Sequence, residues 1–265
     1  MTDASHVNAL NSRRIAVFNA KGGTGKTTTT HALAAGLAAK GRRVLAFDLD
    51  HQANLTFWFG LKDRAPGLDE VVRQGVPLAE AIHATTVPGV ELVPASPFLV
   101  AVDPALRAKM GAEMWLRRQL ERLPDRWDVI LFDCAPGLGI LTIAALAAAG
   151  EVLAPVQPTV LGLAGVARLL ETLEQAREGV NPDLRLLGIL PVMVDRRTAL
   201  TGEVLGQLRE HCGPQLLRSA IGVNVRLAEV PSHAQPIYDY APQSSGAADY
   251  RALTEEVLAH GQAGR

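Results

Sequence analysis

The sequence predicts an α/β protein with one doubly wound, mostly parallel β-sheet and helices on both of its faces. Strand and helix patterns alternate along the whole chain, which favours parallel strands joined by crossover helices. Several predicted strands are apolar at consecutive positions, as strands buried on both faces are. A glycine-rich segment at residues 21–28 stands between the first predicted strand and the first predicted helix.

The predicted elements follow in alternating order. Strands are expected at residues 14–19, 43–48, 90–94, 128–133, 151–155, 185–194 and 215–219. Helices are expected at residues 27–40, 104–123, 138–149, 163–178, 198–211 and 247–260. Gly41 is expected to end the first helix. Asp103 and Pro104 are expected to begin the second, as N-cap and first helical residue. Residues 64–86 are rich in proline and glycine and predict no regular element.

Composition narrows the class of protein. The chain has 265 residues, of which 48% are hydrophobic, so it can bury a sizeable core; we expect a flexible tail at residues 1–12 and a single domain at residues 13–265. The cysteines Cys134 and Cys212 lie far apart, which argues against a disulfide framework or a zinc site. The net charge is −1, so any contact with nucleic acid must come from a local patch. No apolar run is long enough to span a membrane, and a cytoplasmic protein is expected.

The glycine-rich segment reads Lys-Gly-Gly-Thr-Gly-Lys-Thr-Thr and has the context of a phosphate-binding loop. Its glycines allow a tight turn that points backbone N–H groups at an anion, and the following helix adds its positive dipole end. Lys26 is expected to reach the β- and γ-phosphates, and the hydroxyl of Thr27 to ligate Mg²⁺. The candidate phosphate-binding residues are Lys21, Gly22, Gly23, Thr24, Gly25, Lys26, Thr27 and Thr28.

Carboxylates follow two other predicted strands. Asp48 ends the second strand and Asp50 follows it, and Asp133 follows the apolar run 129–132. Because ligands of such sheets bind at the carboxyl ends of strands, these side chains are expected beside the loop. Asp133 is predicted to hold Mg²⁺, and Asp48 to face the water shell of the metal or to cap the turn.

The loop departs from the general phosphate-loop pattern, because Ala20 stands where a glycine is usual and Lys21 follows it. With Asp48-Leu-Asp50-His-Gln52 and Phe132-Asp133-Cys-Ala-Pro136, it resembles the ParA/Soj/MinD group of deviant Walker ATPases. Two later segments narrow the resemblance to the ParA/Soj partition proteins: Ala154-Pro-Val-Gln-Pro158 and Asn224-Val-Arg-Leu-Ala-Glu-Val-Pro-Ser232. The segment at residues 240–247 also resembles the C-terminal region of that group.

The resemblance implies a single P-loop ATPase domain that binds ATP and Mg²⁺ and forms an ATP-dependent homodimer. Lys21 resembles the signature lysine that reaches the partner subunit's phosphates, and no lysine or arginine near it in the sequence could serve its own subunit instead. Asp50 matches the residue that positions the attacking water. Pro231 and Ser232 match the segment that lines the adenine pocket. Nonspecific double-stranded DNA and a ParB-like protein that stimulates slow hydrolysis are the implied partners, with segregation of chromosome or plasmid DNA as the role.

The chain also departs from that family. His51 stands where proline is usual, so the loop after the second strand lacks a fixed φ, and His51 is interpreted as a solvent-exposed histidine. Ala135 replaces one of two prolines. Gly222-Val223 replaces the usual Pro-Arg, which removes a basic residue from the region expected to contact DNA.

A local excess of arginine supports a DNA surface. Residues 185–226 contain six arginines and three acids. Arginine side chains of this kind bind DNA phosphates, which makes the affinity for DNA depend on salt but does not read the base sequence. The candidate DNA-binding residues are Arg196, Arg197, Arg218 and Arg226, and a nucleoid-associated protein is expected. A second basic group at residues 107–126 is interpreted as a solvated helix face.

Three alternatives were weighed. A MinD-like membrane-associated ATPase needs a basic amphipathic C-terminal helix, and the tail at residues 255–265 is acidic and then broken by glycine. An iron–sulfur reductase needs paired cluster cysteines, which Cys134 and Cys212 do not supply. A ParA-like ATPase that positions a protein cargo stays open, because the sequence does not separate it from DNA partition.

Overall fold

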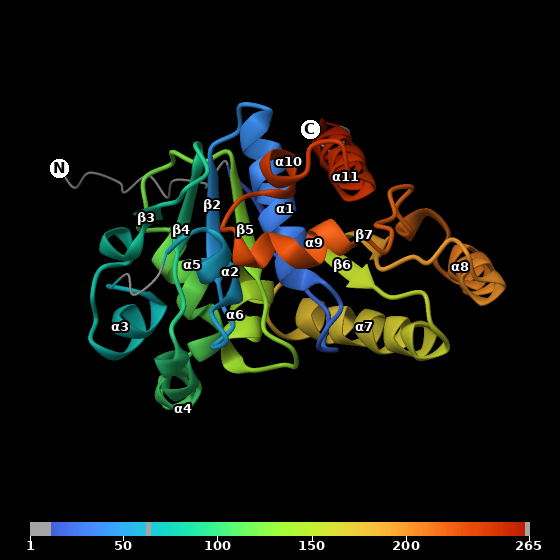
Figure 1. Cartoon of the computed structure of the whole chain (residues 1–265). Coiled ribbons are helices and arrows are strands. Elements are labelled where there is room, and N and C mark those ends of the chain that lie inside the picture. The colour runs from blue at the N-terminus through green and yellow to red at the C-terminus, as the bar shows by residue number, and fades with distance from the viewer. Residues whose placement is uncertain (1–11, 62–64, 263–265) are drawn as a thin grey trace.

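The computed structural model describes residues 12–61 and 65–262, and within them a seven-stranded sheet runs through the molecule in the order β3-β4-β2-β5-β1-β6-β7 (Figure 1). Neighbouring strands are parallel except for β3, which pairs antiparallel with β4 at the edge. The strands are β1 (Arg13–Val17), β2 (Val44–Asp48), β3 (His83–Ala84), β4 (Val90–Val93), β5 (Val129–Asp133), β6 (Glu151–Val156) and β7 (Arg185–Pro191). The doubly wound, mostly parallel sheet is therefore confirmed.

Helices cover both faces of this sheet (Figure 1). The α-helices are α1 (Lys26–Ala39), α2 (Asn54–Trp58), α3 (Leu68–Arg73), α4 (Val102–Arg107), α5 (Trp115–Leu120), α6 (Ile140–Ala148), α7 (Val160–Gly179), α8 (Ala199–Cys212), α9 (Val225–Glu229), α10 (Ile237–Tyr240) and α11 (Ser245–Gln262). Short 3-10 turns are η1 (Leu78–Ala81), η2 (Pro97–Ala101), η3 (Ala112–Met114), η4 (Gly213–Gln215) and η5 (Val230–Ser232).

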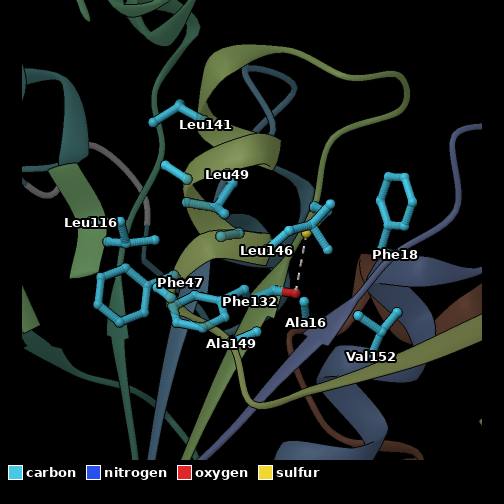
Figure 2. Close-up of a cluster of buried hydrophobic side chains, with 14 of the residues drawn as sticks. Ala16, Phe18, Phe47, Leu49, Leu116, Phe132, Leu141, Leu146, Ala149 and Val152 are labelled. Carbon is cyan, nitrogen blue, oxygen red and sulfur yellow. Dashed lines mark hydrogen bonds between the residues drawn. The ribbon is translucent and has the colours of Figure 1, made fainter. Parts of the chain in front are cut away.

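The sheet separates two hydrophobic clusters, and each central strand contributes side chains to both, because successive side chains point to opposite faces. On β5, Ile130 and Phe132 belong to the cluster under α3 to α7, whereas Val129 and Leu131 belong to the cluster under α1, α10 and α11. Figure 2 shows the first cluster, in which Phe132 lies beside Phe47 of β2 with ring centroids 5.4 Å apart. Because side chains alternate along a strand, a run of consecutive apolar residues fills two cores at once.

The predicted helix at residues 104–123 is wrong as a single element. It is divided into α4, η3 and α5, because Gly111 has φ 63° in the left-handed region and interrupts the helix. Asp103 lies in the first turn of α4 instead of preceding it, and its Oδ1 accepts a hydrogen bond of 2.8 Å from the backbone N–H of Ile140. Asp103 therefore caps α6, a helix distant in sequence. Gly41, with φ 78°, ends α1 as predicted.

The strand predicted at residues 215–219 is also wrong. This segment makes only an isolated bridge between Leu216 and Ile189, and η4 precedes it. The region 64–86, for which no element was predicted, contains α3, η1 and the edge strand β3 among its described residues. Except for Ser12, the tail predicted at residues 1–12 lies outside the described residues, and the single domain at residues 13–265 stays a prediction.

Candidate active site

The site lies where the central strands end. β1 pairs with β5 and β6, and β5 also pairs with β2, so the segments that follow β1, β5 and β2 meet at one edge of the sheet. In the β2–β5 register Asp48 lies opposite Asp133. The sheet therefore brings together the glycine-rich loop, Asp133 and the segment that carries Asp50, as the sequence predicted.

The glycine-rich loop adopts a backbone that only glycine accepts easily. Gly23 and Gly25 have φ 72° and 74°, and α1 begins directly after them at Lys26. The loop is anchored by Asn19, whose Oδ1 accepts a hydrogen bond of 3.0 Å from the backbone N–H of Lys21 and whose Nδ2 donates to the Pro155 carbonyl at 2.8 Å. The loop thus lies at the positive end of a 14-residue helix, which favours an anion.

Lys26 is a buried cation inside this loop. Its Nζ donates a hydrogen bond of 3.0 Å to the carbonyl oxygen of Lys21. Burial lowers the pKa of Lys26, and the nearby carboxylate of Asp133 opposes that change. Among the described residues this carbonyl is the one hydrogen-bond acceptor of the buried ammonium group, which has three N–H donors, and the charge of a phosphate would supply what it lacks.

Asp133 is a fully buried carboxylate with an incomplete set of partners. Its Oδ1 accepts a hydrogen bond of 3.2 Å from the Thr30 hydroxyl, while its Oδ2 has no hydrogen-bond partner among the described residues. Burial, and then the charge of Asp48, raise the pKa of Asp133 well above its usual range; the hydroxyls of Thr27 and Thr30 and the charge of Lys26 act against this. A buried, unpaired carboxylate oxygen near a threonine hydroxyl is a donor set that fits Mg²⁺.

Asp48 and Asp50 have different surroundings. Both oxygens of the buried Asp48 accept hydrogen bonds: Oδ1 from the N–H of Asp50 in the following loop at 3.1 Å, and Oδ2 from the N–H and hydroxyl of Thr56 in α2 at 2.9 and 2.8 Å. Asp50 caps the next turn through the N–H of Gln52 at 3.0 Å. His51 is exposed, as interpreted from the sequence, and its Nδ1 lies 3.4 Å from Asp50 Oδ1. Asp48 thus serves the loop that positions Asp50.

Lys21 is exposed at the outer rim of the loop. It lines a cavity of about 430 Å³ together with Leu138, after β5, and Arg168, on α7. No carboxylate is among the described residues that line this cavity. Arg168 was missed by sequence reasoning, because only the packing of α7 brings it near the loop.

A separate apolar pocket of about 240 Å³ opens on the other side of the loop. Gly25 and Thr28 form one wall, and the remaining lining includes Met193, Val223, Leu227 and Tyr250. Its size and apolar lining suit a nucleobase next to the phosphate loop. Pro231 is not among the lining residues and lies in η5. The sequence resemblance singles out the segment at residues 224–232, which supplies Asn224, Leu227 and Ala228 to the lining, but no local signal identifies Met193 or Tyr250.

Each of the four candidate DNA-binding arginines lies beside a carboxylate. Arg196 is 3.7 Å from Asp249 and Arg218 is 3.6 Å from Glu256, both on α11. The other two pairs, each at 2.8 to 2.9 Å, are Arg197 with Asp195 and Arg226 with Glu229. The hydrogen bond from Arg197 lowers the pKa of Asp195 to about 2, so this carboxylate is ionised at neutral pH. The surface is therefore less positive than the count of arginines indicates.

This chain is similar to known proteins over most of its length. The chain matches the AAA domain family over residues 12–186. The chromosome-partitioning ATPase Soj of Thermus thermophilus is 48% identical over 250 residues, covering 94% of this chain and 97% of that protein. The sporulation initiation inhibitor protein Soj of Bacillus subtilis is 38% identical, covering 93% of this chain and 98% of that protein. The chain belongs to the ParA/Soj family.

Solved structures have the same fold. A structure of cobyrinic acid a,c-diamide synthase from Mycobacterium smegmatis with bound ATP analog and magnesium is 35% identical, with a TM-score of 0.83 over 96% of this chain and 97% of that one. The cell division ATPase MinD of Pyrococcus furiosus is 28% identical, with a TM-score of 0.77 over 93% and 98%. This ParA/Soj protein is therefore an ATP-hydrolysing enzyme with a P-loop fold that uses ATP and Mg²⁺. The roles of its individual residues stay predictions.

One further feature concerns membranes. Within residues 12–61 and 65–262 of this ParA/Soj protein, every helix is too short or too polar to cross a bilayer.

Proposed function

We propose that this ParA/Soj protein is a DNA-partition ATPase whose ATP-bound form is a face-to-face homodimer. The observation that carries the proposal is the position of Lys21: it is exposed at the rim of the phosphate loop, whereas Lys26 of the same loop is buried. In this proposal a cation at the rim meets the phosphates of a second subunit, and its exposure supports that role. There it would stabilise the negative charge that develops on the transferred phosphoryl group.

The surroundings of the loop support association. Leu138, Met193 and Val223 are large apolar side chains that are 41%, 45% and 59% exposed. Leu138 shares a cavity with Lys21, and the other two line the apolar pocket beside Gly25. Exposed apolar side chains gathered around one site indicate an interface. The dimer would then bury these side chains together with the nucleotide.

Within one protomer, the chain's own residues have separate tasks in this proposal. Lys26 and the loop amides hold the triphosphate, and Thr27 and Asp133 hold Mg²⁺, which neutralises phosphate charge when it is bound. Asp50 orients the water that attacks the γ-phosphate. The Gly25 pocket takes the adenine; the resemblance assigns this task to Pro231, and that assignment stays a prediction.

DNA binding in this proposal depends on arginines that already have carboxylates beside them. Exposed ion pairs such as Arg197–Asp195 contribute little stability, so DNA phosphates can compete with the carboxylates for the arginines. One protomer would then bind weakly, and dimerisation would double the number of contacts and raise the affinity. A ParB-like partner that stimulates hydrolysis would release the DNA, and we expect the protein on the nucleoid.

Sedimentation velocity tests the proposal directly. Wild type and Lys21→Ala are measured without nucleotide, with ADP and with ATP plus Mg²⁺, each with and without plasmid DNA. We expect an ATP-specific dimer that cosediments with DNA in the wild type, and a monomer in the variant at equal ATP occupancy. A wild-type protein that stays monomeric under all conditions would contradict the proposed dimer. A dimer that does not cosediment with DNA but binds a protein cargo would favour the cargo-positioning alternative.

A further inference from the structure

The segment between β2 and α2 carries Asp50 but has little regular structure of its own. Residues 49–53 connect the two elements, and Ala53 adopts a left-handed φ of 51° just before α2. A segment of this kind needs side chains from its surroundings to hold one geometry. The buried carboxylate of Asp48 supplies the first such contact, because its Oδ1 accepts a hydrogen bond from the backbone N–H of Asp50 at 3.1 Å.

Thr56, in the middle of α2, supplies the second contact. Its hydroxyl donates to Asp48 Oδ2 at 2.8 Å and accepts a hydrogen bond from the backbone N–H of Ala95 at 2.9 Å. The backbone N–H of Thr56 also donates to Asp48 Oδ2, at 2.9 Å. The Thr56 side chain is buried, so both its donor and its acceptor are used without competition from water. A continuous chain of hydrogen bonds thus runs from the segment after β4, through Thr56 and Asp48, to Asp50.

The end of α2 is fixed against the helix that follows the phosphate loop. His31 of α1 is 2% exposed, and its ring centroid lies 5.8 Å from Trp58, edge to face, and 4.5 Å from Phe59. α2 is therefore held by α1 at one end and by the Thr56–Asp48 contact near its centre. With α2 fixed at both places, Thr56 holds the carboxylate of Asp48 in the orientation in which it accepts the hydrogen bond from the Asp50 N–H.

We propose that Thr56 is a positioning residue for ATP hydrolysis: its hydroxyl fixes Asp48, and Asp48 fixes the loop from which Asp50 reaches the attacking water. Thr56 itself contacts neither ATP nor the water in this proposal. The inference rests on the assignment of Asp50 under the proposed function. It goes beyond that assignment because it names the residue that sets the position of Asp50.

Two substitutions separate the hydroxyl of Thr56 from its shape. Thr56→Val keeps the volume and the backbone N–H but removes the hydroxyl, and Thr56→Ser keeps the hydroxyl. Because misplacing a catalytic group by about 1 Å costs on the order of a hundredfold in rate, we expect kcat of Thr56→Val to fall about tenfold to a hundredfold with KM for ATP nearly unchanged. Thr56→Ser should restore most of the lost kcat.

Thr172→Val is the matched control. Thr172 is a buried threonine of α7 whose hydroxyl donates to a backbone carbonyl, that of Arg168, at 2.8 Å, but it has no contact with the Asp50 segment. Both valine variants lose a buried hydroxyl, and the melting temperature should fall more in Thr56→Val, because its hydroxyl has two partners and one of them is a buried carboxylate. Only Thr56→Val should lose kcat. Equal losses of kcat in the two variants, or a loss of ATP affinity in Thr56→Val that matches its loss of kcat, would show a general structural effect and overturn the inference.

A double-mutant cycle tests whether Thr56 acts through Asp50. Asp50→Ala is expected to retain ATP-dependent dimerisation and to lose turnover. Thr56→Val should cause no further loss of the residual turnover that Asp50→Ala retains, whereas independent effects would add. Full turnover in Asp50→Ala would remove the assignment of Asp50 itself. Loss of turnover in Asp50→Ala with normal kcat in Thr56→Val would overturn only the role of Thr56.

Discussion

Lys26 and Asp133, at the carboxyl end of the central strands, are buried, whereas the side chains of Arg197 and Arg218 are 85% and 89% exposed. Among the described residues neither buried group has a full set of hydrogen-bond partners. Burial lowers the pKa of Lys26 and raises the pKa of Asp133, so it favours the neutral form of each. The exposed arginines have carboxylates beside them and lose little free energy to desolvation. Buried charges that are short of partners therefore indicate a ligand much more strongly than an excess of surface arginine does.

The largest effect should come from the buried cation. Lys26→Ala removes the ammonium group from the loop, and because charge-assisted hydrogen bonds are worth about 1.5–3 kcal/mol each, ATP affinity should fall on the order of a hundredfold or more in calorimetric titration. Lys40→Ala is the control, since Lys40 lies at the other end of α1, half-exposed and paired with Glu255. Comparable ATP affinity in the two variants would contradict the conclusion that the buried lysine binds the nucleotide and the exposed one does not.

The buried carboxylate should show the next effect. Asp133→Asn removes the negative charge opposite Thr27, so turnover should fall about a hundredfold and titration with Mg²⁺ should saturate at a higher concentration. Asp69→Asn is the matched control: Asp69 is also buried with a raised pKa, but it lies in α3 and accepts a hydrogen bond from the hydroxyl of Ser96. Identical Mg²⁺ dependence in wild type and Asp133→Asn would remove the carboxylate from the metal site.

Burial should also affect the pH dependence of the free energy of unfolding, through His31. Burial lowers the pKa of His31 to about 4 from its ordinary 6.5, so the folded state favours the neutral ring. The neutral ring of His31 therefore makes its full contribution to the free energy of unfolding above pH 6.5, and this contribution is lost as the pH falls towards 4. The loss amounts to roughly 3 kcal/mol, at about 1.4 kcal/mol per pKa unit.

His31→Phe keeps the ring contacts with Trp58 and Phe59 and should abolish this part of the acid sensitivity in urea denaturation from pH 7 to pH 4. His211→Gln, at an exposed histidine of α8, should leave the slope as it is in the wild type. An unaltered slope in His31→Phe would assign the acid sensitivity to other groups.

The smallest effect is expected on the exposed side. Arg218→Glu should weaken the binding of the ATP-bound protein to plasmid DNA by several-fold at low salt, with little difference at high salt and with DNA-free ATPase activity retained. Arg117→Glu, at a partly exposed arginine of α5 paired with Glu121, serves as control for a general change of charge. Equal losses in both variants would point to net charge, and unchanged binding in Arg218→Glu would place the DNA surface elsewhere.

The strands and the phosphate loop could be predicted because their signals are local. The apolar run ending at Asp133 and the glycines before Lys26 restrict the backbone through neighbouring residues alone. The helix expected at residues 104–123 was wrong because Gly111 interrupts it and because Asp103 pairs with Ile140, a partner distant in sequence. Short segments such as β3 and η4 depend on what packs against them, and their own residues do not specify them.

The candidate site divides in the same way. The sequence by itself determined the loop, its two lysines, the carboxylates at the ends of β2 and β5, and the family, since each is a short run of residues whose chemistry requires that order. The tertiary structure alone decided that Thr56 joins Asp48 to the segment after β4, that Arg168 lies near Lys21, and that Arg196 and Arg218 lie beside carboxylates of α11. Those contacts join segments that meet only when the sheet and helices pack, and the balance of desolvation against pairing there is set by distances that no local pattern encodes.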